Sequence, residues 1–213
     1  MSQTTIVTTI GACEPITTKI ARDLVKFDIP GDCSCFLHAV LLASRKSYQE
    51  KSDWKSRAEI VTYCRATLAL RFTFAEYSKL GNGNTKVLGS MMPEFSYSNL
   101  KDNLSLPRYV GDSLLQFVSD QLNLDIYIIS KRTDQVYKIP ADITLLYKNR
   151  PSVILLYDDH QTAKINSNGV MTVEGVGRHY ELIGQLRNNG AEVLVYFDYT
   201  DPLIVGLKKQ LTK

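Results

Sequence analysis

The 213-residue sequence predicts a single α+β domain, because segments with helical periodicity come first and strand-like segments follow. Up to residue 122, apolar residues recur mainly at helical spacing. From residue 126 onward, short runs of β-branched and aromatic residues indicate strands. A chain of this length is sufficient for one domain with a substantial hydrophobic core.

The helical part of the prediction depends on three segments. Residues 36–44 are apolar almost all round, which is typical of a helix buried inside a domain. The polar pair at residues 52–53 can cap a helix that extends to about residue 75. Residues 111–122 predict a further helix, and the N-terminal stretch to residue 29 has weak helical spacing.

Strand-like runs follow at residues 126–129, 136–139, 153–157, 178–183 and 193–197. The run at 153–157 is the clearest buried strand, because all its residues are apolar or aromatic. We expect residues 158–177 to form a loop and residues 202–211 to form a tail element.

The composition argues against several classes of function. A net charge of +3 without a basic block does not indicate a nucleic-acid-binding protein. No run approaches the roughly 20 apolar residues of a membrane span, and the N-terminus lacks the pattern of a signal peptide. The four cysteines lack the spacing of a zinc site, and free thiols fit a reducing compartment. We therefore expect a cytoplasmic protein that binds neither nucleic acid nor membrane and needs no metal or cofactor.

Residues 31–40 contain the strongest candidate for chemistry, because a loop ends there in a cysteine and continues as an apolar helix. A thiol at a helix N-terminus lies near unpaired backbone N–H groups and the positive end of the helix dipole, which lower its pKa. Cys35 is therefore the candidate nucleophile. Cys13 and Cys64 are expected to be inert.

A cysteine nucleophile needs an imidazole to take up its proton, and the chain has three histidines. His38 follows Cys35 on the same predicted helix, so we expect it to be packed or hydrogen-bonded rather than opposite the thiol. His160 lies beside two aspartates in the predicted loop, where solvation is favoured over a metal site because no further ligands are apparent. His179 enters a predicted strand, which can present its imidazole to the start of the helix.

The residues around Cys35 and His179 resemble two motifs of the ovarian-tumour (OTU) family of papain-like cysteine proteases. Residues 31–40, which read Gly-Asp-Cys-Ser-Cys-Phe-Leu-His-Ala-Val, resemble the nucleophile motif of that family. Residues 177–181, which read Gly-Arg-His-Tyr-Glu, resemble its histidine motif. A third similar block, residues 109–129, lies between them in the order of the family.

The resemblance implies an OTU-like papain-like fold, in which helices flank a central mixed β-sheet. The catalytic domain would occupy residues 26–200. Residues 1–25 would then be an N-terminal lead or packed extension, and residues 201–213 a C-terminal tail element.

The resemblance also implies roles for individual residues. Cys35 matches the nucleophile, and His179 matches the general base. Asp32 matches the first motif position, which orients the histidine in several members of the family. In other members the orienting group lies two residues after the histidine, at Glu181 in this chain. We favour Asp32 over Glu181, which stays a candidate because strand alternation places it on the same face as His179.

Two positions depart from the family pattern. Cys33 stands where the family usually has glycine, and Ser34 where it usually has asparagine. Glycine adopts a positive φ without steric cost, whereas a cysteine at positive φ costs free energy. The backbone N–H groups of Asp32, Cys33 and Cys35 are the expected donors of an oxyanion hole.

The function that the resemblance implies is that of a thiol-dependent deubiquitinase. Such an isopeptidase hydrolyses the bond at the C-terminus of ubiquitin, polyubiquitin or another ubiquitin-like modifier. Asp158, Asp159 and Tyr180 are the expected substrate-binding residues, because carboxylates can bind the arginines of the modifier's tail. Two alternatives stay open: a catalytically inactive ubiquitin-binding module, and a viral polyprotein-processing protease. A viral member of the family would act in the host cytoplasm.

Overall fold

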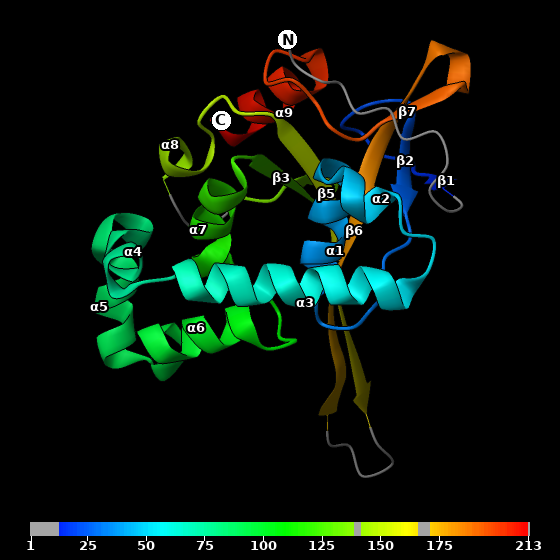
Figure 1. Cartoon of the computed structure of the whole chain (residues 1–213). Helices are drawn as coiled ribbons and strands as arrows, with labels where there is room; N and C mark the ends of the chain where they lie inside the picture. Colours follow the sequence, from blue (N-terminus) through cyan, green and yellow to red (C-terminus); the bar gives the residue numbers. More distant parts are fainter. Residues whose placement is uncertain (1–12, 139–141, 166–170, 213) are drawn as a thin grey trace.

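The computed structural model describes residues 13–138, 142–165 and 171–212, and within 159–165 and 171–177 it describes only the backbone. In these residues a mixed β-sheet is flanked by helices, as the sequence predicts (Figure 1). No helix in this part of the chain combines the length and apolar character needed to cross a membrane.

The described residues form a seven-stranded sheet. Its strands are β1 (Cys13–Pro15), β2 (Leu24–Phe27), β3 (Asp125–Ser130), β4 (Gln135–Val136), β5 (Ser152–Ile165), β6 (Met171–Arg187) and β7 (Glu192–Leu194). The strand order is β1-β2-β6-β5-β3-β4, and β7 pairs with the end of β6. β3 and β5 are parallel, whereas the other pairs are antiparallel. The sheet is therefore mixed, with β6 and β5 at its centre.

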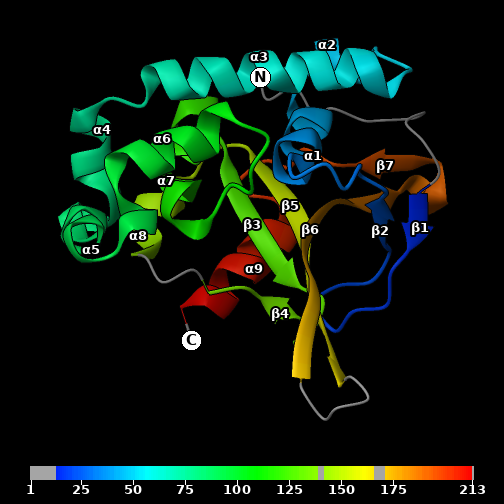
Figure 2. The same cartoon turned by 90° about the horizontal axis from the view of Figure 1, so that it is seen from below.

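Helices cover both faces of this sheet. They are α1 (Cys35–Ser44), α2 (Lys46–Gln49), α3 (Trp54–Arg71), α4 (Phe74–Lys79), α5 (Asn84–Met91), α6 (Tyr97–Ser105), α7 (Asp112–Leu122), α8 (Ile143–Leu146) and α9 (Pro202–Leu211). Short 3-10 turns occur at η1 (Leu80–Gly83), η2 (Pro93–Phe95) and η3 (Asn188–Gly190). α1 and α3 lie on one side of the sheet and α9 lies on the other (Figure 2).

α1 is the helix predicted from residues 36–44, and it begins at the candidate nucleophile. Every residue from Cys35 to Ala43 is buried, because the helix lies between α3 and the central strands. Burial of each large apolar side chain stabilises the fold by about 1.5–3 kcal/mol. This all-round burial fixes the start of the helix firmly against β6.

Two predicted helical segments differ from the structure. The stretch before residue 29 contains β1 and β2 instead of a helix, because Leu24, Val25 and Phe27 are buried where β2 pairs with β6. The helix predicted to reach residue 75 ends at Arg71. Thr73 then starts α4, since its side chain accepts a hydrogen bond from the N–H of Glu76.

The predicted loop at residues 158–177 is wrong for the described part of that segment. β5 and β6 continue as an antiparallel pair from Asp158 opposite His179 to Ile165 opposite Met171. Figure 1 shows this pair extending beyond the rest of the sheet. Backbone pairing sustains the strands here, although the sequence lacks the apolar alternation that would predict them. Residues 166–170 lie outside the described part.

Candidate active site

The thiol of Cys35 lies against the backbone of β6. Cys35 is the first residue of α1, and 2% of its surface is exposed. The backbone N–H of Tyr180 donates a hydrogen bond to its Sγ, with an N···S distance of 3.4 Å. That nitrogen is bonded to the carbonyl carbon of His179. The fold therefore places the thiol of Cys35 against the backbone of Tyr180, which directly follows the candidate base His179.

A strained turn leads into α1. Cys33 has a φ of 62°, in the left-handed region that glycine occupies without steric cost. The side chain of Asp32 supports this turn, because its Oδ1 accepts a hydrogen bond of 2.9 Å from the N–H of Ser34. A cysteine in this conformation costs about 1 kcal/mol or more. The glycine of the family pattern would avoid that cost.

The environment of Cys35 favours its neutral form. Burial is the largest influence and raises the pKa of the thiol, whereas hydrogen bonds from the N–H groups of Tyr180 and Phe36 lower it. The nearby negative charges of Asp32 and Cys33 raise the pKa further. The expectation of a thiol pKa lowered by the helix terminus is therefore wrong for this structure. A base must remove the proton before the sulfur can attack.

His179 lies on β6 beside two carboxylates. One nitrogen of its ring and one oxygen each of Asp28 and Glu181 lie within 4.8 Å of one another. Glu181 is buried and accepts a hydrogen bond of 2.8 Å from Nζ of Lys26. This contact raises the pKa of Lys26. The structure thus places Glu181 beside His179 and adds Asp28 as a second neighbour.

Asp28 is a site residue that the sequence analysis missed. It directly follows β2, which pairs with β6 at Phe27 opposite Leu182. Its position beside His179 therefore depends on the register between two strands that are far apart in the sequence. An isolated aspartate after a short apolar run carries no signal of that register.

The same three side chains are the group in the described residues that could share a metal ion. A cation there would compete with Lys26, which already compensates the charge of Glu181 at 2.8 Å. The arrangement therefore fits the orientation of an imidazole better than it fits metal binding.

Asp32 has partners other than His179. Its Oδ2 lies 2.9 Å from Nε2 of His38, and Oδ1 accepts the N–H of Ser34. The structure therefore directs this carboxylate to α1, and it brings Glu181 and Asp28 to His179 instead. Asp32, the first candidate for orienting His179, therefore has its hydrogen-bond partners on the nucleophile loop and α1.

His38 is packed and hydrogen-bonded, as its position on the helix suggests. It is 1% exposed, and its Nδ1 lies 2.6 Å from the hydroxyl of Tyr48. Burial lowers the pKa of His38, although Asp32 opposes this shift. A neutral ring can donate from Nε2 to Asp32 and accept at Nδ1 from Tyr48, whose own pKa burial raises.

The expected oxyanion-hole donors lie along the same turn. Among the described residues, the backbone N–H groups of Asp32, Cys33 and Cys35 donate to no protein acceptor. They therefore remain the candidate donors of an oxyanion hole.

The expected substrate-binding residues occupy different environments. The Tyr180 side chain is 2% exposed and stacks on Tyr109 with ring centroids 5.6 Å apart, so it is a packing residue. Asp158 is partly buried, and its Oδ2 lies 2.6 Å from Nζ of Lys131. The side chain of Asp159 lies outside the described part of the structure.

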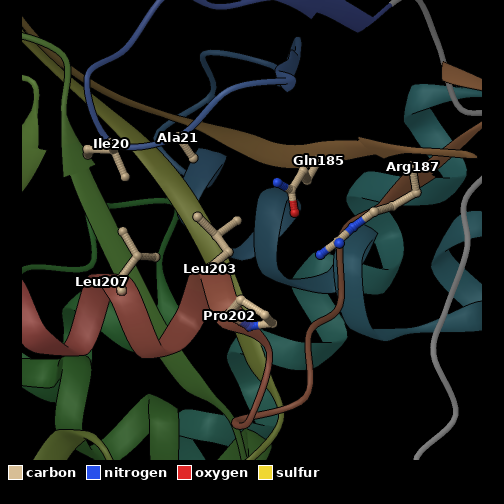
Figure 3. A pocket seen from close by; sticks show the side chains of 8 residues that line it. Ile20, Ala21, Gln185, Arg187, Pro202, Leu203 and Leu207 are labelled. Carbon is tan, nitrogen blue, oxygen red and sulfur yellow. The ribbon is translucent and has the colours of Figure 1, made fainter. Parts of the chain in front are cut away.

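A separate pocket of about 270 Å³ lies at the far end of β6. Figure 3 shows it between the N-terminal stretch, β6 and α9, with side chains from Ala21, Gln185, Arg187 and Leu203. Neither Cys35 nor His179 contributes to it. The candidate active site is therefore the junction of α1 and β6.

Comparison with known proteins found similar solved structures. The chain matches no protein-family model and no curated protein sequence. One similar structure is described as an ovarian-tumour (OTU) domain in complex with ubiquitin. It is 14% identical with a TM-score of 0.47, and the match covers 88% of this chain and 82% of that chain. The OTU domain of OTUD1 is 16% identical with a TM-score of 0.38, and the match covers 76% of this chain and 85% of that chain.

Proposed function

We propose that this protein is a cysteine isopeptidase that hydrolyses the bond at the C-terminus of ubiquitin or a ubiquitin-like modifier. The observation that carries the proposal is the contact between Sγ of Cys35 and the N–H of Tyr180, beside His179. The order of the two motifs along the chain supports the same assignment.

In the proposed reaction, His179 accepts the proton of Cys35, and the thiolate attacks the carbonyl carbon of the modifier's last residue. Backbone N–H groups of Asp32, Cys33 and Cys35 stabilise the oxyanion of the tetrahedral intermediate. His179 then donates its proton to the leaving lysine amine, which leaves a thioester on Cys35. Water, deprotonated by His179, hydrolyses the thioester and regenerates the thiol.

A carboxylate beside His179 holds its ring in the required orientation in this proposal. One oxygen of Glu181 and one of Asp28 lie within 4.8 Å of a ring nitrogen of His179, so a small side-chain movement would bring either into hydrogen-bond range. Glu181 is buried and fixed by Lys26, whereas Asp28 is exposed. We favour Glu181, because a buried and anchored carboxylate positions an imidazole more precisely.

The test uses a fluorogenic reporter attached to the C-terminus of ubiquitin. The wild-type protein should release the fluorophore, Cys35→Ala should abolish release, and His179→Ala should lower kcat by about 1,000-fold or more. Cys13→Ala is the matched control, because it removes another free thiol, on the strand β1 that β2 separates from β6. Equal rates for wild type and Cys35→Ala would reject the proposal.

A catalytically inactive ubiquitin-binding module is the second candidate. The burial of Cys35 and its raised pKa favour this reading, because both reduce the reactivity of the thiol. A ubiquitin probe with a C-terminal electrophile distinguishes the two. An isopeptidase would form a covalent adduct through Cys35, whereas a binding module would bind ubiquitin without the adduct.

A further inference from the structure

A buried arginine lies directly behind the nucleophile loop. Arg65, on α3, is 2% exposed. Its guanidinium carries five N–H hydrogens, and hydrogen bonds lead from it to five acceptors. These are Oγ of Ser34 and the backbone carbonyl oxygens of Cys33, Asn103, Leu104 and Arg108, at 2.7–3.3 Å. Every donor of this side chain is therefore used, and every acceptor is uncharged.

On one side, Arg65 fixes the peptide unit between Cys33 and Ser34. The carbonyl oxygen of that unit accepts from Arg65 at 3.0 Å, and its N–H donates to Asp32 at 2.9 Å. Because a peptide unit is planar, holding both ends fixes its orientation. This restraint stabilises the positive φ of Cys33 and sets the direction in which the neighbouring N–H groups point.

On the other side, Arg65 holds the segment that follows α6. Its shortest hydrogen bond, 2.7 Å, is to the carbonyl oxygen of Arg108. The next residue, Tyr109, stacks on Tyr180. The N–H of Tyr180 in turn contacts Cys35. A single guanidinium thus joins the loop that carries the nucleophile to the residues that pack beside His179.

We propose that Arg65 is a positioning residue for the reaction proposed above, and the inference rests on that proposed function. Arg65 holds the 33–34 peptide unit and the 103–108 segment at a fixed separation, so that the thiol and the oxyanion donors meet the substrate in one geometry. A lysine cannot replace it, because its three N–H donors radiate from one nitrogen and cannot span both sides.

The kinetic test compares Arg65→Lys with a matched variant elsewhere. Arg150→Lys makes the same change at a second arginine with five hydrogen bonds, to Ser119, Asp120, Asp125 and Leu146. On the ubiquitin reporter, Arg65→Lys should lower kcat by about 10-fold to 100-fold with KM changed by less than about twofold. Arg150→Lys should leave kcat within about twofold of wild type. Unchanged kcat in Arg65→Lys, or equal losses in both variants, would overturn the proposal.

A substrate-free measurement separates this inference from the proposed function. Amide hydrogen exchange across residues 32–38 should accelerate about tenfold in Arg65→Lys and stay unchanged in Arg150→Lys. A wild-type protein without reporter activity would reject the isopeptidase, while the exchange data would still test the restraint. Unchanged exchange in Arg65→Lys would show that Arg65 does not hold the loop.

Discussion

The two arginines with five hydrogen bonds each serve their regions differently. Arg150 binds two carboxylates, with Nε 2.8 Å from Asp125 and NH1 2.7 Å from Asp120. Arg65 binds four carbonyl groups and one hydroxyl, and burial lowers the pKa of its guanidinium. Burying a guanidinium without a carboxylate partner costs stability. Arg150 and its partners, which we call the Arg150 cluster, are therefore arranged for stability. Arg65 and its five acceptors, which we call the Arg65 cluster, instead fix backbone geometry beside Cys35.

The largest loss of stability is expected when the guanidinium of Arg150, which compensates the charge of two carboxylates, is removed. Arg150→Met leaves the carboxylate of Asp125, whose side chain is 1% exposed, without its guanidinium partner. We expect a loss of about 3–5 kcal/mol in the free energy of unfolding, because an uncompensated buried charge remains. Urea unfolding followed by circular dichroism measures this loss.

A second substitution tests whether charge is the cause. Adding Asp125→Asn to Arg150→Met removes the stranded charge and keeps one oxygen that accepts from the N–H of Lys148, while the other oxygen, which accepts from the N–H of residue 150, becomes an NH2 group. The double variant should regain at least about 1 kcal/mol over Arg150→Met. If it is no more stable, charge compensation does not explain the Arg150 cluster, and the contrast with Arg65 fails.

Folding stability should be lost at low pH through His38, which lies near the Arg65 cluster rather than the Arg150 cluster. His38 has a pKa below the ordinary histidine value of 6.5, mainly through burial, and the positive charge of Arg65 contributes to that shift. The folded state therefore binds fewer protons than the unfolded state just below pH 6.5. Stability should be present above that pH and be lost as the pH falls toward the folded pKa.

The expected loss from this group is about 1 kcal/mol for each unit by which its pKa is lowered. His38→Gln should flatten the stability–pH profile below pH 6.5, as measured by urea unfolding at several pH values. Arg150→Lys should shift the whole profile downward without changing its slope in that range. A wild-type slope retained in His38→Gln would assign the acid sensitivity to another group.

Local patterns in the sequence were sufficient for several elements. α7 ends at Leu122 as predicted, because Asn123 adopts the left-handed conformation (φ 55°) that ends helices. α1 follows from an uninterrupted apolar run, and the α+β order follows from the change of period. Such features depend on neighbouring residues alone, which is why they could be predicted.

The parts of the site that could not be predicted depend on long-range contacts. Asp28 reaches His179 through the β2–β6 register. The contact of Asp32 with His38 spans only six residues, but it depends on how the loop closes onto α1, which helical periodicity does not indicate. Arg65 looks like an ordinary charged position on a helix, and its role arises only when α6 and the nucleophile loop pack against α3. Sequence periodicity contains none of this information.

The smallest expected effects come from one serine in each cluster. Oγ of Ser34 accepts from Nε of Arg65 at 3.1 Å, and Oγ of Ser119 accepts from NH2 of Arg150 at 2.7 Å. Both serines are buried, so each substitution by alanine should cost about 1 kcal/mol of stability. Ser119→Ala should cost slightly more, because that hydroxyl also donates to the carbonyl of Leu124.

Ser34→Ala should lose more activity than Ser119→Ala, although it should lose slightly less stability. Ser34 is the N-cap residue of α1, and its hydroxyl helps to hold the guanidinium that orients the 33–34 peptide unit. Ser34→Ala should therefore lower kcat on the ubiquitin reporter by about threefold to tenfold, whereas the less stable Ser119→Ala should keep the wild-type value. Equal loss of kcat in the two variants would mean that activity follows overall stability. The geometric role assigned to the Arg65 cluster would then have no support from this pair.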